Sequence, residues 1–345
     1  MYKSLNYIVG AVLLGLLVAT PVSAQILGED TEPIRVSVTP QMPAPGQTVN
    51  LEVQGIGTFL GDAKITWIQD GKIVKNGLGE RVYSFVAGQL GKLTRIEMTI
   101  DSPSVGIFTR SFTFIPSTIN LMWEADTSVP PLYRGKALYA PGSNLRVTAF
   151  PQVVTGGRTI SASSLSYQWK RGGEPVPSQS GKGRSLFAFA GNQLKGNESV
   201  SVDVYLGTAL VGQGSITIPV TKPQIVLYQR DPLRGVLWNE ALPSAISLTT
   251  KEITVQAVPY FFSNDSLSSS DLTFEWKLDG RTTTGPNADD GLMTLRQTGE
   301  GAGQTRLSVE LQNLNGTKLL QSAETAVRMI FGAQSSDGIS SFFGL

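Results

Sequence analysis

A tryptophan followed four residues later by a glycine recurs three times in this chain at nearly constant spacing. The pairs are Trp67 with Gly71, Trp169 with Gly173, and Trp276 with Gly280. The intervals between the tryptophans are those of an immunoglobulin-sized domain of about 100 residues. A tryptophan in a central strand can bridge the gap of about 10 Å between two packed sheets. The Asp-Gly or Gly-Gly pair after it suits a two-residue hairpin turn, which needs positive φ angles.

The hydropathy pattern between these hairpins has a period of two. Apolar and polar residues alternate over short segments rich in Val, Ile and Thr, at residues 34–38, 93–100, 145–150, 200–206, 252–258 and 306–311. Such segments predict strands of antiparallel sheets with one face in water. No amphipathic helix longer than two turns fits the sequence. We therefore expect an all-β chain of β-sandwiches or barrels.

Similar segments at the ends of the repeats predict the domain boundaries. Residues 112–118 resemble residues 216–221, and both precede an apolar strand. Residues 131–138 also resemble parts of 232–242, so the second and third repeats are the closer pair. The predicted organisation is a signal peptide at residues 1–24, domains at residues 31–116, 117–220 and 221–331, and a tail of linker composition at residues 332–345.

The tryptophan hairpin, the domain size and the tandem array resemble bacterial immunoglobulin-like modules of the PKD type over residues 31–331. The hairpin at residues 67–71 lacks the aromatic-Gly-Asp-Gly run that usually follows the tryptophan in that family. The resemblance implies three tandem Ig-like, PKD-like antiparallel β-sandwiches. It also implies an extracytoplasmic spacer, adhesive or assembly module without catalysis.

The first 24 residues have the pattern of a secretory signal peptide. Lys3 makes the amino-terminal end positive, and an apolar run at residues 8–18 is too short to span a bilayer as a helix. Val22 and Ala24 are the small residues of a cleavage site before Gln25. We expect an exported protein of the cell envelope or the extracellular space. The alternative is a segment that stays uncut as a membrane anchor.

The chain contains no His and no Cys. These absences exclude Ser–His and Cys–His couples, a disulfide framework and nearly every zinc, copper or haem site. Lys and Arg number 28 against 27 Asp and Glu, so the charge predicts no nucleic acid and no anionic membrane as a partner. We expect no enzyme and no cofactor.

Two acidic residues, Asp289 and Asp290, lie in an oxygen-rich loop of the third repeat. Loops of this kind can bind Ca²⁺, which takes six to eight oxygen ligands. Asp and Asn are also what a hairpin connection needs for its own turn. Adjacent loop carboxylates do not supply the separated acid pair of a glycosidase.

Two groups of aromatic residues are candidate partner contacts. Tyr260, Phe261 and Phe262 follow Pro259 at the end of a predicted strand, with Trp238 and Tyr133 in connecting segments. They predict either a surface for sugar or protein, or a filling of the sandwich ends and domain junctions. The second group is Phe342, Phe343 and Leu345 in the tail, which either dock on a partner sheet or pack back on the third domain.

The sequence therefore predicts a non-enzymatic secreted or envelope-associated rod of Ig-like domains. Its expected role is adhesion, spacing or scaffolding in a surface apparatus, for example one associated with a pilus, and its expected partners are envelope or surface proteins. The alternative is a carbohydrate-binding accessory module of a secreted system. That alternative needs exposed aromatic side chains, so burial of Trp238 and of residues 260–262 would count against it.

Overall fold

The computed structural model describes residues 34–55, 60–103, 106–194, 196–267, 269–299 and 301–332. The proposed signal segment and the tail residues Phe342, Phe343 and Leu345 lie outside them, so both remain predictions. Within the described residues the regular structure is almost entirely β-strand. Apart from one parallel strand pair in the third sandwich, the strands form antiparallel sheets around three separate apolar cores.

The first sandwich packs a three-stranded sheet against a four-stranded one. The first sheet has the order β1-β2-β5 and the second the order β4-β3-β6-β7. The bounds are β1 Ile34–Thr39, β2 Thr48–Gly55, β3 Lys64–Gln69, β4 Lys72–Leu78, β5 Val82–Val86, β6 Thr94–Ser102 and β7 Gly106–Phe114. All pairs are antiparallel.

The second sandwich repeats this arrangement with sheets β8-β9-β15 and β13-β12-β16-β17, where β14 also pairs with β12. The bounds are β8 Thr118–Ala125, β9 Asn144–Gln152, β12 Ser166–Arg171, β13 Glu174–Pro175, β14 Gly181–Lys182, β15 Leu186–Ala190, β16 Glu198–Leu206 and β17 Ala209–Ile218. A small ribbon and two 3₁₀ turns decorate it: β10 Val154–Thr155, β11 Arg158–Thr159, η1 Ala162–Ser164 and η2 Pro177–Gln179.

The third sandwich has the sheets β19-β18-β21-β24 and β20-β26-β25-β22-β23. The strands are β18 Gln224–Asp231, β19 Gly235–Ala241, β20 Ala245–Ser247, β21 Glu252–Tyr260, β22 Leu272–Leu278, β23 Arg281–Thr283, β24 Leu292–Arg296, β25 Gly303–Asn313 and β26 Ser322–Phe331. The short helices are α1 Asn264–Leu267 and η3 Ala288–Asp290. Strand β20 runs parallel to β26, and β19 is an added strand at the edge of the first sheet.

The same strand order underlies all three sandwiches once β19, β20 and β14 are set aside. Strands one, two and five form one sheet, and strands four, three, six and seven form the other. This is an immunoglobulin-like arrangement with a tryptophan on the third strand. The predicted fold class, three tandem Ig-like antiparallel β-sandwiches, is confirmed.

The three repeated tryptophans lie at the centres of the cores. Trp67 and Trp169 have no exposed surface, and Trp276 is 1% exposed. Each indole N–H donates to a backbone carbonyl in the segment that leads to the fifth strand of its sandwich. The acceptors are Glu80 at 2.9 Å, Arg184 at 2.9 Å and Ala288 at 3.0 Å. Each tryptophan therefore ties the two sheets together through apolar contact and one satisfied hydrogen bond.

The glycines that follow the tryptophans occupy two-residue hairpin turns. Gly71, Gly173 and Gly280 have φ angles of 81°, 90° and 79°. The residues before them also have positive φ, which defines the primed turn that matches strand twist. Asp279 fits this position because its carboxylate accepts the backbone N–H of Arg306 at 2.7 Å. That hydrogen bond holds the pKa of Asp279 below its usual value.

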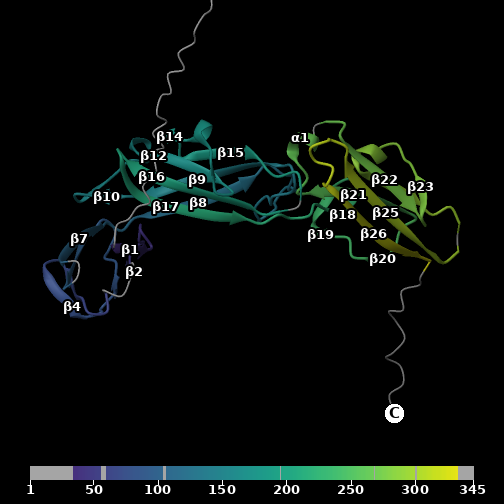
Figure 1. The fold of residues 1–345 in the computed structure, drawn as a ribbon. Helices are drawn as coiled ribbons and strands as arrows, with labels where there is room; N and C mark the ends of the chain where they lie inside the picture. The colour runs from purple at the N-terminus through teal and green to yellow at the C-terminus, as the bar shows by residue number, and fades with distance from the viewer. Residues whose placement is uncertain are drawn as a thin grey trace, which may run out of the picture.

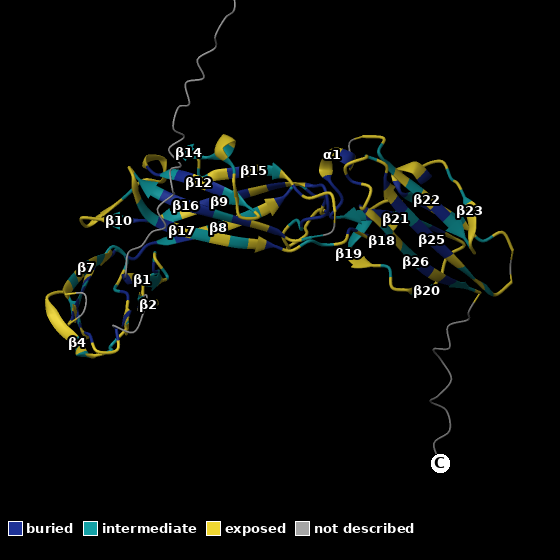
Figure 2. Cartoon of the chain, in the orientation of Figure 1, coloured by how far each residue is buried: buried dark blue, intermediate teal, exposed yellow. Residues whose placement is uncertain are grey.

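The second and third sandwiches follow one another along a common direction, and the first is bent away from that line (Figure 1). Buried and exposed residues alternate along most strands (Figure 2), as expected for sheets with one wet face. The linker between the second and third sandwiches is short, because β17 ends at Ile218 and β18 begins at Gln224. The backbone N–H of Thr221 in this linker donates to Tyr139 of the second sandwich at 2.7 Å.

Candidate functional site

The second and third sandwiches meet through a strand-like contact between two loops. The loop after β8 brings Thr127 into an isolated antiparallel bridge with Ser263. The backbone N–H of Ser128 donates to Phe262 at 2.7 Å, and the N–H of Phe261 donates back to Ser128 at 2.8 Å. The Ser128 hydroxyl donates to the carbonyl of Pro259 at 3.0 Å. The two sandwiches are thus joined by backbone pairing as well as by the linker.

A buried polar network completes this junction. Gln321 has no exposed surface, and its amide nitrogen donates to the carbonyl of Pro141 in the second sandwich at 2.7 Å. The same nitrogen donates to the Ser263 hydroxyl at 2.7 Å. Its amide oxygen accepts the backbone N–H of Ser263 at 3.0 Å and the side-chain amide of Asn313 at 3.1 Å. Every polar atom of the Gln321 side chain therefore has a partner, which makes its burial stable.

Close backbone packing makes the junction tight. Gly142 has a φ of +76°, and a Cβ placed there would lie 2.4 Å from the carbonyl oxygen of Thr317 in the third sandwich. Only glycine allows both the left-handed conformation and this approach. Beside it, Lys318 is buried and paired with Asp265. Between the first and second sandwiches, the backbone N–H of Ser117 donates to the carbonyl of Pro43 at 3.3 Å.

The aromatic residues singled out in the sequence divide between this junction and the surface beside it. Phe261 is 5% exposed and Phe262 has no exposed surface, so an exposed partner contact is wrong for these two, and they fill the domain junction as in the second alternative. Their burial follows from the loop pairing, which folds the third sandwich's end against the second. Tyr260 and Trp238 stay half-buried, so the burial that would count against carbohydrate binding is found only at Phe261 and Phe262. The ring of Tyr260 meets Tyr133 edge-on at 5.9 Å, and its hydroxyl lies 2.6 Å from that of Tyr228.

This arrangement perturbs the acidity of two tyrosines. Burial, together with the neighbouring Tyr228 hydroxyl, raises the pKa of Tyr260 well above its usual value. Burial also raises the pKa of Tyr139 to about 12, with a further contribution from the negative charge of Glu198. Both phenols are therefore neutral at physiological pH, and they act as hydrogen-bonding and packing groups.

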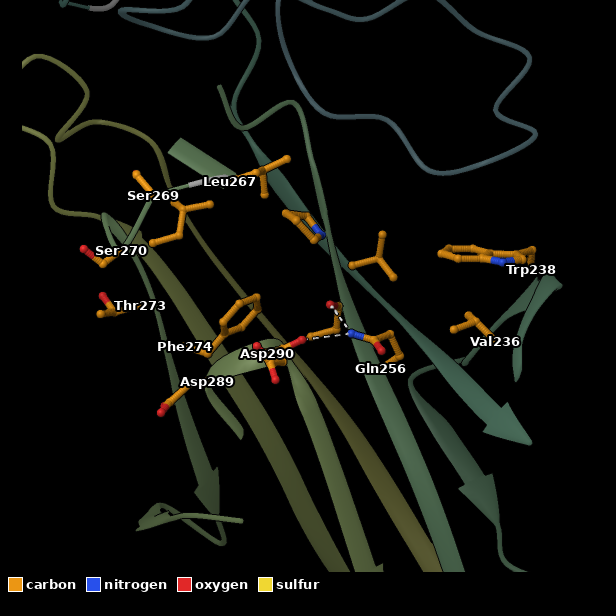
Figure 3. Close-up of a pocket in the computed structure, with 14 residues that line it drawn as sticks. Val236, Trp238, Gln256, Leu267, Ser269, Ser270, Thr273, Phe274, Asp289 and Asp290 are labelled. Atoms are coloured by element: carbon orange, nitrogen blue, oxygen red, sulfur yellow. Dashed lines mark hydrogen bonds between the residues drawn. The ribbon is translucent and has the colours of Figure 1, made fainter. Parts of the chain in front are cut away.

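A groove of about 650 Å³ lies beside the aromatic residues, on the third sandwich. Figure 3 shows Trp238 and Val236 of β19 on one side and Phe274 of β22 with Asp290 on the other. Val255 and Ala257 of β21 point into the core, so the alternating Gln256 and Val258 face the groove. The groove therefore extends from the outer face of the first sheet, at β19 and β21, to β22 of the second sheet.

Asp289 and Asp290 are exposed at the rim of this groove, on η3. Neither carboxylate accepts a hydrogen bond from a described residue. Across the described part of the chain, no three acidic side chains gather closely enough to hold a metal ion. The weak calcium site proposed for Asp289 and Asp290 thus gains no third acidic ligand there. In Figure 3, Asp290 lies beside Phe274 and Gln256, whereas the Asp289 side chain points away from Trp238.

Sequence reasoning missed the junction network and the groove. Ser128 and Gln321 are polar residues of connecting segments and Asn313 ends β25. No local pattern pairs residues 128 and 262. The β18–β19 hairpin had one readable signal, the turn Asp231 to Gly235, where Asp231 accepts the backbone N–H groups of Leu233 and Arg234 at 2.9 Å each.

No protein-family model and no curated protein matches this sequence. Solved structures resemble it at low identity. The three N-terminal domains of the bacteriophage RB49 highly immunogenic outer capsid protein are 11% identical, with a TM-score of 0.25, over 87% of this chain and 98% of that one. The central fibronectin-III array of RIM-binding protein is 12% identical, with a TM-score of 0.29, over 89% and 100%.

A third similar structure is the Bacteroides ovatus mixed-linkage glucan utilization locus protein SGBP-B in complex with a mixed-linkage heptasaccharide. It is 10% identical, with a TM-score of 0.24, over 86% of this chain and 70% of that one. The sheet order and the three separate cores define the fold of this chain. Among the described residues, no helix has the length and apolar character needed to cross a membrane.

Proposed function

We propose that this chain is a non-enzymatic, exported rod of three Ig-like domains, at residues 31–116, 117–220 and 221–331, related to bacterial PKD-type modules. Its role is spacing, adhesion or scaffolding within a surface apparatus such as a pilus system. The observation that carries this proposal is the paired and hydrogen-bonded junction between the second and third sandwiches. Domains of one chain move relative to one another unless their interface is extensive, and a spacer needs that motion suppressed.

The test compares two glycine variants in the source organism. Gly142→Ala forces the second and third sandwiches apart, whereas Gly156→Ala alters a turn with open space around it. If stiffness serves a surface apparatus, Gly142→Ala will reduce the number of assembled surface structures seen by electron microscopy, and Gly156→Ala will not. A deletion strain whose surface structures and adhesion match the wild type would overturn the proposal.

The tail contributes the proposed partner contact through Phe342, Phe343 and Leu345. Replacing Phe342 and Phe343 by Ser tests it without shortening the chain, and a chain that stops after Phe331 is the stronger variant. We expect both to lose the crosslinked envelope partner while melting like the wild type. A lower melting temperature with an unchanged partner would show that the tail is part of the third domain's fold.

A further inference from the structure

One half-buried tryptophan differs from the three in the cores. Trp238 lies on the added edge strand β19, where its ring packs on Tyr228 at a centroid distance of 5.3 Å. The core indoles all donate to backbone carbonyls, but the N–H of Trp238 donates to no described residue. Because no described polar side-chain atom is both buried and unsatisfied, this N–H reaches solvent. Trp238 therefore offers the groove an aromatic ring and a free donor.

The groove combines apolar walls with hydrogen-bonding groups at its rim. Phe274 faces Trp238 across the groove, and Val258 and Leu272 add apolar surface. The polar groups are the carboxylates of Asp289 and Asp290, the hydroxyl of Thr273 and the amide of Gln256. Its volume of about 650 Å³ is within the usual range for a small-ligand site. The groove is too polar at its rim for a purely apolar ligand.

The charge of the lining narrows the ligand class. No Lys or Arg is among the described lining residues, and both ionised groups are carboxylates. An anionic ligand would meet like charge without a cation to pair it. The carboxylates can only accept hydrogen bonds, so they need a ligand rich in O–H donors. Hydrogen bonds from hydroxyl groups to a charged carboxylate are stronger than hydrogen bonds between two neutral groups.

We propose that this groove binds a neutral oligosaccharide, with the apolar face of one pyranose ring stacked on Trp238 and the hydroxyls of a neighbouring sugar unit donating to Asp290. A pyranose has one face of C–H groups and a rim of hydroxyls, which matches an aromatic wall beside carboxylate acceptors. The half-buried ring of Tyr260 and the exposed ring of Tyr133 extend the aromatic surface toward the second sandwich. This binding goes beyond the spacer function, which does not need it.

The experiment uses the purified full chain on an array of neutral and anionic oligosaccharides, followed by titration calorimetry with the best ligand. We expect binding to neutral hexasaccharides and none to polygalacturonate or heparin fragments. Trp238→Ala should weaken binding about tenfold or more, and Asp290→Asn several-fold. Trp238→Phe retains an aromatic ring and should retain part of the affinity. This variant still tests the proposal if Trp238→Ala fails to fold.

Trp123→Ala is the matched control. Trp123 is another half-buried tryptophan, on β8, but the amino group of Lys136 covers its ring at 3.3 Å from the centroid. Its loss should leave affinity within twofold of the wild type. The proposal is overturned if no neutral glycan binds, if anionic glycans bind better, or if Trp238→Ala and Trp238→Phe both bind like the wild type. None of these results would change the spacer proposal, whose readout is assembly of the surface structures.

Discussion

Replacing Gly142 by Ala tests whether the second and third sandwiches form one stiff unit. The new Cβ would lie 2.4 Å from the Thr317 carbonyl oxygen, well inside the closest normal contact. The left-handed backbone itself costs an Ala residue about 1–2 kcal/mol. Gly156→Ala incurs that same cost at a φ of +56° but contacts nothing within 4 Å. The difference between the two variants therefore isolates the junction.

The extra cost comes from separating the two backbones. A shift of the Gly142 backbone away from Thr317 stretches the adjacent hydrogen bond from Gln321 to Pro141, which is buried. Loss of one buried partner costs roughly 1–3 kcal/mol. For a cooperative unit of about 200 residues, this loss lowers the melting temperature of Gly142→Ala by about 3–10 °C more than the left-handed backbone of an Ala residue does by itself.

Two assays read this out. Calorimetry gives the melting temperature, and spin labels at Lys182→Cys and Arg281→Cys report the distance between the sandwiches. Both sites are exposed, and the native chain has no Cys to compete for the label. We expect a narrow distance distribution in the otherwise native chain and in Gly156→Ala, and a broad one in Gly142→Ala. Equal melting and equal distance distributions in the two variants would refute the reasoning.

Three further predictions follow from single sites. Trp276→Ala should lower the unfolding free energy by about 3–5 kcal/mol in urea titrations, because it opens a cavity and strands the Ala288 carbonyl; a change under 1 kcal/mol would contradict this. Folding lowers the pKa of Asp279, so the ionised carboxylate stabilises the folded state. This stabilisation is fully present above the pKa of Asp279 in the unfolded chain, and it is lost as the pH falls through the lower pKa of the folded chain. The stability gap between wild type and Asp279→Asn should therefore shrink from pH 6 to pH 3 in denaturant titrations, and a constant gap would contradict the assignment. Intact mass of the exported protein should correspond to a chain starting at Gln25, whereas a full-length mass in the membrane fraction would favour the uncut anchor.

The β-sandwich fold was predictable because its determinants are local and repeated. The alternation of apolar and polar residues along 200–206 or 252–258 follows from the burial of one strand face. The Asp-Gly or Gly-Gly pair after each tryptophan follows from the positive φ angles of a two-residue turn. The burial of Phe262 was not predictable in the same way. It depends on which loop faces it across the junction, and the alternation in β21 would equally suit an exposed sandwich end.

The segments at 131–138 and 232–242 show why similar sequence does not determine one local structure. In the third sandwich the segment turns at Pro232 and adds β19 to the sheet edge, which places Trp238 on the outer face. In the second sandwich, residues 130–142 form no strand and lie against the end of the third sandwich through Tyr133 and Pro141. The difference is the neighbour available to each segment, which a local pattern does not contain.

The junction and the groove are connected through a continuous row of aromatic side chains. Tyr133 of the second sandwich packs on Tyr260, whose hydroxyl meets that of Tyr228, and Tyr228 carries the ring of Trp238. Because Tyr133 packs on Tyr260, the closed junction brings the second sandwich next to the outer aromatic face of the third. A stiff junction between the second and third sandwiches therefore also holds the aromatic face in a fixed orientation relative to the second sandwich. Stiffness and presentation of a ligand surface are thus two consequences of one packed interface.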